Sequence, residues 1–344
     1  MKKRGVNIPF GVRILGGILT ALVFALGSLL VSPFSPALAQ QAEKIFRIGF
    51  LDPSNHSGSA VLLDAFRQEL RKFGWIEGKN IAIEYRFGDS KGGAHLSELA
   101  ADLVRLNVDL IVVAGTPSAV AAKHSTTNIP IVIATAENPV GEGLIASLAR
   151  PGGNLTGLSS LGTELATKRL EILKDTVPKL ARVGILQQPG RGQSIQLKGL
   201  RAAALELKLT LEEIDTQPDA KSFDSIFKTA KQKRVGAIMT TTGITFFARR
   251  RQIIELAGKY ELPAIYPQKG FVDEGGLMSY GADYDDLYRR AAVYVDKILR
   301  GAKPADLPVQ QPRKFEFVVN LKAAKQISLT IPANVLARAD KVIK

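Results

Sequence analysis

Short stretches rich in Ser, Thr and Gly stand directly before helical patterns at two places in the chain, Pro53–Ser57 and Gly115–Ser118. The first turn of a helix has backbone N–H groups without intrahelical partners and the positive end of the helix dipole, so both stretches suit a carboxylate. The alternative is that these Ser and Thr side chains only cap their own helices. The residues expected to contact a ligand carboxylate are Ser54, Ser57, Gly115, Thr116 and Ser118.

Two acidic residues, Glu137 and Asp283, follow strand-like runs closely. A ligand that carries an ammonium group needs a carboxylate or carbonyl oxygens opposite it, and these two side chains are the candidates. The alternative for each is a solvated surface acid.

Further candidates stand where other strand-like runs end. Asn138, Gln188 and Thr242 are polar residues at such ends, and Tyr266 is an aromatic one. Tyr266, with Phe246 or Phe247, could cover an apolar or aromatic part of a ligand, although Phe at helical spacing is more often part of the core.

Motifs for catalysis, metals or nucleic acids are missing from the sequence. His56, His95 and His124 are too scattered for a metal motif, and the chain has no cysteine. "GRGQS" lacks the Lys-Ser/Thr of a phosphate loop, and no G-x-S-x-G elbow follows a strand. The net charge of +14 is spread along the chain without aromatic interleaving. We therefore expect no cofactor, no metal, no nucleic-acid partner and no enzyme activity.

The N-terminus has the pattern of an export signal. A basic start is followed by the nearly apolar run 14–31, and Ala37-Leu38-Ala39 matches a small-x-small cleavage site. We expect residues 1–39 to be removed after Ala39 and the chain to work in the periplasm. The alternative is an uncleaved anchor, because the apolar run is near the minimum spanning length.

From residue 46 onward, apolar strands alternate with amphipathic helices, which predicts parallel sheets covered on both faces. Residues 152–160 are interpreted as a strand that crosses between two similar halves, and as a hinge candidate. The strands expected are 45–51, 80–88, 108–115, 129–135, 154–160, 182–188, 209–215, 235–242 and 262–267, with a further one before residue 284 and one near residue 315. The helices expected are 60–74, 95–107, 116–127, 140–149, 163–178, 194–208, 222–233, 245–260 and 284–300.

Several quoted segments, in this order and spacing, are similar to one known family. They include "GWIEGKNIAIEYRFGD", "VDLIVVAGTPSAVAAK", "IPIVIATAENPVGEGLIASLARPGGNLTGLSS" and "SYGADYDDLYRRAAVYVDKILRGAKPADLPVQQP". The chain resembles the ABC-transporter substrate-binding proteins of the family associated with tryptophan and tyrosine uptake. One departure is Glu137-Asn138-Pro139-Val140, where many relatives have an Asp-Pro-Val sequence.

This resemblance implies a type I periplasmic-binding fold, with two Rossmann-like lobes joined by a multi-strand hinge and a ligand in the cleft. The first lobe is expected to comprise residues 44–157 and 280–302, and the second lobe residues 158–279 and 303–344. The expected function is capture of a small ligand, such as an amino acid or related carboxylate, and delivery to permease subunits by hinge closure, with the protein as a monomer. The alternatives are a sensory receptor of the same fold and a periplasmic α/β enzyme.

Overall fold

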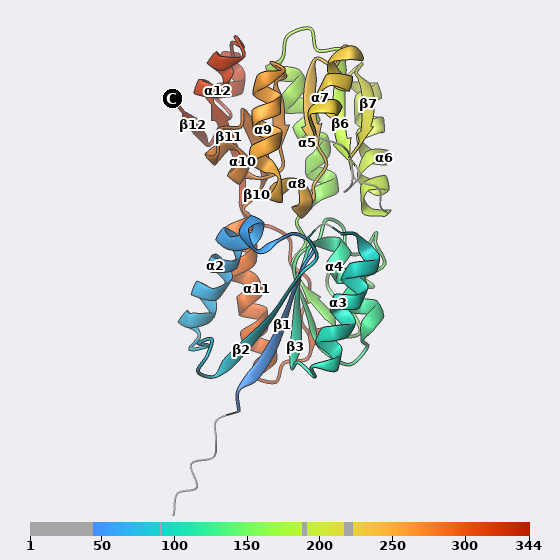
Figure 1. Cartoon of the computed structure of the whole chain (residues 1–344), viewed down its shortest axis with the longest axis vertical. Helices are drawn as coiled ribbons and strands as arrows, with labels where there is room; N and C mark the ends of the chain where they lie inside the picture. Colours follow the sequence, from blue (N-terminus) through green and yellow to red (C-terminus); the bar gives the residue numbers. More distant parts are fainter. Residues whose placement is uncertain (1–43, 90, 188–190, 217–222) are drawn as a thin grey trace, which may run out of the picture. The chain divides into compact units, whose positions relative to one another are not determined.

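The computed structural model describes residues 44–89, 91–187, 191–216 and 223–344. The expected leader, residues 1–39, and the expected site residue Gln188 lie outside the described residues. Residues 45–344 form one unit, which contains two sheets (Figure 1). Within the described ranges, no helix is both long enough and apolar enough to cross a membrane.

The first sheet is parallel throughout, with strand order β2-β1-β3-β4-β5. All residues of β3, β4 and β5 are buried, as is typical of strands covered on both faces. The strands are β1 (Phe46–Asp52), β2 (Ile81–Phe87), β3 (Leu110–Ala114), β4 (Ile131–Thr135) and β5 (Leu155–Gly157).

Alternate side chains of the first sheet enter two different buried clusters. Leu110 and Val112 of β3 pack with residues of two helices on one face, and Ile111 and Val113 pack with residues of two other helices on the opposite face. We call this sheet with its four helices the first lobe. The helices are α2 (His56–Lys72) and α11 (Tyr284–Leu299) on one face, and α3 (Gly93–Arg105) and α4 (Gly115–Ser125) on the other.

The second sheet has strand order β12-β11-β10-β9-β8-β6-β7 and is parallel except for the antiparallel β10–β11 pair. We call this sheet with its helices the second lobe. The strands are β6 (Arg182–Gln187), β7 (Thr210–Asp215), β8 (Ala237–Thr240), β9 (Ala264–Tyr266), β10 (Met278–Ala282), β11 (Phe315–Asn320) and β12 (Lys341–Ile343). The helices are α5 (Gly162–Thr176), α6 (Arg191–Glu206), α7 (Phe223–Gln232), α8 (Ile244–Ala248), α9 (Arg250–Lys259), α10 (Lys269–Asp273), α12 (Leu321–Gln326) and α13 (Ala333–Leu336).

The two-lobed α/β architecture is thus confirmed, but two expected helices differ. Residues 140–149 form successive turns instead of a helix, because Gly143 adopts a left-handed φ of 69° within this short segment. The expected helix 245–260 is two helices, α8 and α9, which are separated at Arg249.

The expected lobe boundaries also need two corrections. Residues 280–282 belong to β10 and therefore to the second sheet, whereas they were expected in the first lobe. Residue Val309, expected in the second lobe, is buried in a core cluster of the first lobe. The short 3-10 helix η1 (Pro304–Asp306) contacts β5 of the first sheet as well.

Three segments cross between the lobes, and they are hydrogen-bonded to one another. After β5, Ser159 donates its backbone N–H to Gln310 O (2.8 Å), and Gln310 donates to Gly157 O (2.9 Å). The backbone N–H of Asp283 donates to Lys314 O (3.1 Å). The first crossing therefore follows Gly157, at the end of the 152–160 stretch that the sequence marked as a hinge candidate.

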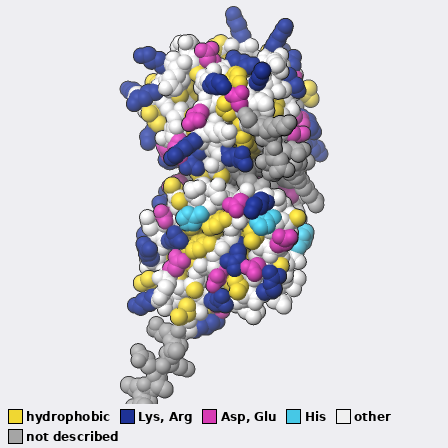
Figure 2. Space-filling model, viewed as in Figure 1, with side chains coloured by type: hydrophobic (Ala, Val, Ile, Leu, Met, Phe, Trp, Pro, Cys, Tyr) yellow, Lys and Arg dark blue, Asp and Glu magenta, His cyan; other side chains and the backbone are white. Residues whose placement is uncertain are grey.

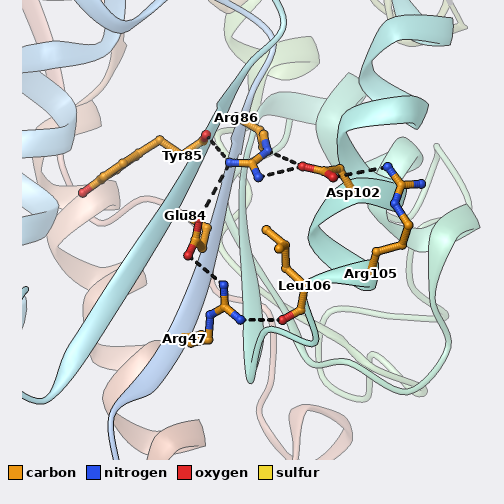
Figure 3. Close-up of polar contacts among 7 residues, drawn as sticks. All are labelled: Arg47, Glu84, Tyr85, Arg86, Asp102, Arg105 and Leu106. Atoms are coloured by element: carbon orange, nitrogen blue, oxygen red, sulfur yellow. Dashed lines mark hydrogen bonds and ion pairs between the residues drawn. The ribbon is translucent and has the colours of Figure 1, made fainter.

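A network of ion pairs ties β1, β2 and α3 of the first lobe together (Figure 3). Glu84 lies between Arg47 (2.9 Å) and Arg86 (3.9 Å), and Arg86 also pairs with Asp102 of α3 at 2.6 Å. The hydrogen bond from Arg86 holds the pKa of Asp102 below its usual range, with Arg105 contributing. The network fixes the outer strand β2 against α3.

Candidate functional site

The loop after β1 is organised around one buried carboxylate. Asp52 accepts hydrogen bonds from the backbone N–H and the hydroxyl of Ser54 (both 2.7 Å) and from the hydroxyl of Ser59 (2.6 Å). Burial raises the pKa of Asp52, although the three donors oppose this effect. Ser57 is exposed and donates to the Asn55 side chain, which caps α2. In this structure Ser54 and Ser57 shape the loop and the helix cap.

The loop after β3 leads into a helix without a capping side chain. Gly115 has a left-handed φ of 78°, and its N–H donates to Thr135 Oγ1 (3.2 Å). The N-cap residue of α4, Ala114, offers no side-chain acceptor. Ser118, one turn further on, is fully buried, and its hydroxyl has no hydrogen-bond partner among the described residues. The N-terminus of α4 is therefore available to an anion from elsewhere.

Glu137 supplies such an anion in this structure. The Thr116 hydroxyl donates to a carboxylate oxygen of Glu137, and the Glu137 N–H donates to Thr116 Oγ1 (3.3 Å). Burial raises the pKa of Glu137, and hydrogen bonds from the Thr116 hydroxyl and from backbone N–H groups oppose the rise. The groups expected to bind a ligand carboxylate and a ligand ammonium are thus in contact with each other. Asn138 accepts a hydrogen bond from Gly141 N–H (2.9 Å) in the following turn.

The second lobe contributes Thr242, which is held by two side chains. Its Oγ1 accepts from Arg169 Nη2 (3.0 Å) and from Gln196 Nε2 (3.0 Å), and its N–H donates to Gln196 Oε1 (3.0 Å). Arg169 also donates to Tyr280 O (3.1 Å). Two side chains of the second lobe therefore fix the position of the Thr242 hydroxyl.

Arg169 is a buried cation that the sequence analysis missed. It is 1 % exposed, its Nε has no hydrogen-bond partner, and within the described ranges no carboxylate pairs with it. Burial lowers its pKa to about 10. A signal was present, because Arg169 occupies the apolar stripe of its helix together with Leu165, Ala166 and Leu173.

Gly162 brings the two lobes together at this place. A Cβ atom built on Gly162 would lie 2.7 Å from Glu137 Cγ of the first lobe and 3.2 Å from Thr242 Oγ1 of the second. The Gly162 carbonyl also accepts from Gln196 Nε2 (2.8 Å). Glu137 and Thr242, expected from separate strand ends, therefore both lie next to Gly162, and Thr116 contacts Glu137.

Tyr284 belongs to the same site and was also missed. Burial raises the pKa of Tyr284 to about 12, the Glu137 charge adds to this rise, and hydrogen bonds with Ser160 and Gln268 oppose it. The preceding residue, Asp283, caps α11 by accepting from the Asp286 N–H (2.9 Å). Tyr284 lies two residues after the end of β10, so the strand-end signal that identified Asp283 was present for Tyr284 as well.

The aromatic candidates lie in the core of the second lobe. Tyr266 is 1 % exposed and stacks on Phe271 with ring centroids 4.4 Å apart. Phe246 and Phe247 are buried as well. All three belong to one buried hydrophobic cluster.

Comparisons with known proteins agree on one family. The sequence profile described as ABC transporter substrate binding protein matches residues 47–343. A protein named tyrosine-binding protein, from Clostridioides difficile strain R20291, is 26 % identical over 289 residues, which cover 84 % of this chain and 82 % of that protein.

Two solved structures are similar over 87 % of this chain and 100 % of theirs. One is a conserved domain protein from Vibrio cholerae (28 % identity, TM-score 0.80). The other is an ABC domain from Streptococcus pneumoniae in complex with L-Trp (26 % identity, TM-score 0.76). The profile match over nearly all of residues 45–344, together with the two-lobed fold, confirms the resemblance: the chain belongs to the ABC transporter substrate-binding protein family.

Proposed function

We propose that this protein is the periplasmic receptor of an ABC importer and that its ligand is an amino acid with an apolar or aromatic side chain. The observation that carries the proposal is the meeting of Glu137 and Thr242 around Gly162, because it brings a first-lobe anion and a second-lobe donor to one place. The names of two relatives, a tyrosine-binding protein and a domain solved with L-Trp, support this ligand class.

We assign the ligand ammonium to Glu137. Its carboxylate is fixed by the Thr116 hydroxyl at the N-terminus of α4, so its position is set before a ligand arrives. A bound ammonium group would also offset the cost of burying this charge.

We assign the ligand carboxylate to Thr242. Arg169 and Gln196 hold the Thr242 hydroxyl in place, and the buried guanidinium of Arg169 supplies a positive potential there that no carboxylate of the described residues neutralises. Arg169 therefore acts as a positioning residue, through Thr242. The sequence-based expectation, a ligand carboxylate at Gly115–Ser118, is the competing placement, and it requires Glu137 to leave the N-terminus of α4.

Ligand contacts with both lobes favour the closed arrangement, because they form together only when the cleft is shut. In this proposal the closed protein, a monomer, presents both lobes to permease subunits in the inner membrane. No covalent step takes place, and the leader 1–39 directs the chain to the periplasm before it is cut after Ala39.

Calorimetric titration tests the proposal on the chain from Gln40 onward, after unfolding and refolding to remove bound ligand. Tryptophan, tyrosine and phenylalanine come first, and we expect one-to-one binding at micromolar affinity or better, about −8 kcal/mol. Absence of binding by a folded protein across all amino acids would refute the ligand class.

Two analogues of phenylalanine separate the two ends of the ligand. 3-Phenylpropionate lacks the ammonium group and 2-phenylethylamine lacks the carboxylate. Glu137→Gln should weaken phenylalanine about tenfold, since about 1.5 kcal/mol of a charge-assisted hydrogen bond is lost, and should leave 3-phenylpropionate unchanged. Thr242→Val should weaken phenylalanine and leave 2-phenylethylamine unchanged.

Glu164→Gln, a change on the exposed surface of α5, is the control and should bind all three ligands as the parent does. If Glu137→Gln instead strengthens 3-phenylpropionate binding, the ligand carboxylate lies at the N-terminus of α4 and our placement of the two ends is reversed.

A further inference from the structure

The lobes also touch where α2 of the first lobe meets α8 of the second (Figure 1). Figure 2 shows the surfaces of the two lobes in contact along a waist. Gly58 lies in the first turn of α2 and is buried, and Ala248 is the last residue of α8. A Cβ atom built on Gly58 would lie 2.9 Å from Ala248 Cβ and 3.1 Å from Ala248 Cα. A side chain at Gly58 therefore has no room in this arrangement.

Glycine is an unusual residue for this position. Apart from proline it is the least favourable residue inside a helix, and a close approach by another part of the chain is one reason for its use. At Gly58 the approaching part belongs to the other lobe. By contrast, a Cβ atom built on Gly93, the first residue of α3, would meet nothing within 4 Å. The missing side chain at Gly58 thus affects how near the lobes can come.

The start of α2 is fixed to the first lobe on both sides of Gly58. The Gly58 N–H donates to the Asn55 side chain (2.8 Å). The hydroxyl of the next residue, Ser59, donates to the buried carboxylate of Asp52 (2.6 Å), which is the last residue of β1. These bonds tie the first turn of α2 to the sheet. A clash at Gly58 is therefore relieved by movement of the lobe and not by a local shift of the helix.

The helix α8 is fixed in the second lobe by its two phenylalanines. Phe246 and Phe247 are buried, and the ring of Phe247 meets the ring of Phe271 edge-on, with centroids 5.9 Å apart. A Cβ atom built on Gly270 would lie 2.6 Å from Phe247 Cε2, so this ring packs directly on the backbone of α10. This packing holds Ala248 in place opposite α2.

The contact lies away from the segments that cross between the lobes. The helix α2 follows β1, and β3 and β4 separate β1 from β5, after which the first crossing begins. Neighbouring strands are about 4.8 Å apart, so β1 lies roughly 14 Å from β5. In the second sheet, β9 separates β8, which α8 follows, from β10, after which another crossing begins. A rotation about the crossings therefore changes the distance between Gly58 and Ala248 more than distances beside the crossings.

We propose that Gly58 and Ala248 form a stop, which sets how far the lobes close and thereby how tightly the ligand binds. The inference rests on the proposed function, because ligand binding is what favours the closed arrangement there. With both backbones held rigidly, full closure is reached only when residue 58 has no side chain. The pair acts by positioning, because closure decides whether Glu137 and Thr242 reach the ligand together.

Gly58→Ala should weaken amino-acid binding about fivefold or more in calorimetric titration. Carbon atoms in contact are about 3.5–4.0 Å apart, so the lobes would stop roughly 0.6 Å short of their present separation. The added methyl group would also lie 3.1 Å from Asn55 Oδ1, so this variant disturbs the cap of α2 as well.

Ala248→Gly separates these two effects, because it makes room at the contact and leaves the cap unchanged. Alone it should bind amino acid as the parent does, and combined with Gly58→Ala it should recover most of the lost affinity. Gly93→Ala is the matched control, with an added methyl group in open space, and should bind as the parent does. If the double variant binds no better than Gly58→Ala, the inference is overturned.

A disulfide tests whether the two residues meet in solution. The chain has no cysteine of its own, so Gly58→Cys combined with Ala248→Cys allows a single disulfide within one chain. The Cβ atoms of a disulfide are about 3.5–4.5 Å apart, which closed lobes reach with a small separation and open lobes exceed. With oxidised glutathione as the oxidant, saturating amino acid should speed formation of this disulfide at least fivefold. An unchanged rate overturns the inference.

The same double-cysteine variant keeps this inference apart from the proposed function. If no amino acid binds the parent, the proposed function fails, and the ligand-free variant then decides the inference alone. Formation of the disulfide in ligand-free protein supports the contact between α2 and α8, because a protein that opens and closes visits the closed arrangement without ligand. Absence of the disulfide overturns the contact.

Discussion

Gly162→Ala should weaken ligand binding while the folded protein keeps its stability. In the structure, the added Cβ would lie 2.7 Å from Glu137 Cγ and 3.0 Å from Glu137 Cβ. Carbon atoms in van der Waals contact are about 3.5–4.0 Å apart, so the two lobes must separate by roughly 0.8 Å or more at this point. Gly162 lies two residues after Ser160, close to the segment that crosses between the lobes. An opening of the lobes at Gly162 therefore becomes larger with distance from this crossing and is greatest at the far rim of the cleft.

The magnitude follows from the cost of overpacking, about 1–3 kcal/mol for an extra methyl group in a filled site. This cost applies to the closed, ligand-bound arrangement, because the ligand-free protein can relieve the contact by opening. The dissociation constant should therefore rise about 5- to 150-fold. Alanine also gains about 1 kcal/mol of helix propensity at the start of α5, but this gain is common to the free and bound forms and cancels in the affinity.

Calorimetric titration measures the affinity, and urea unfolding of the ligand-free protein measures the stability. Gly199→Ala is the matched control, because its added Cβ would lie 3.8 Å from the nearest atom, Thr167 Cγ2. Gly199→Ala should bind ligand as the parent does and unfold at slightly higher urea. Unchanged affinity in Gly162→Ala would refute the idea that the lobes must meet at Gly162 for the ligand to bind.

Gly157→Ala should lower the free energy of unfolding by at least ~2 kcal/mol, because Gly157 has a φ of 130° and an added Cβ would lie 2.2 Å from Ile133 O. Urea unfolding at 25 °C measures this change. A variant as stable as the parent would contradict the prediction. Asp52 has a raised pKa, so the folded state binds its proton more tightly than the unfolded state does, and stability falls as pH rises from about 3.9 through the folded pKa. In Asp52→Asn, the free energy of unfolding, measured with urea between about pH 4 and pH 7, should fall less steeply as pH rises. An equally steep fall in this variant would mean that other groups cause it. Arg86→Leu should raise the pKa of Asp102 toward its ordinary value, and a carboxyl-carbon NMR titration that shows no rise would mean that Arg86 does not hold this pKa down.

The elements of both lobes could be predicted because their signals are local. The uninterrupted apolar runs of β3 and β4, each followed by a helical pattern, are enough to indicate parallel strands. The turns at 140–149 were mistaken for a helix because apolar spacing there resembles a helix, whereas the φ of Gly143 decides the backbone. The short helix α10 and the strand β12 have too few residues to show any period.

The site was predictable in part. Strand ends identified Thr116, Glu137 and Thr242; in the structure Glu137 and Thr242 lie next to Gly162, and Thr116 contacts Glu137. Arg169 and Tyr284 were missed because their importance depends on contacts with residues far away in the sequence. The contact between Glu137 and the N-terminus of α4 could not be predicted, because it depends on how the chain packs and not on the spacing of residues in the sequence.

The position of α11 in the chain sets the order in which the protein can fold. The first sheet is complete in sequence at Gly157, but the helix that covers it together with α2 is not made until Leu299. At about 5–20 residues per second, a ribosome needs roughly 7–30 s to make this intervening stretch. During that time Leu62, Leu63 and Phe66 of α2 lack the α11 residues that bury them in the finished protein. The first lobe therefore cannot complete its core before most of the second lobe has been synthesised.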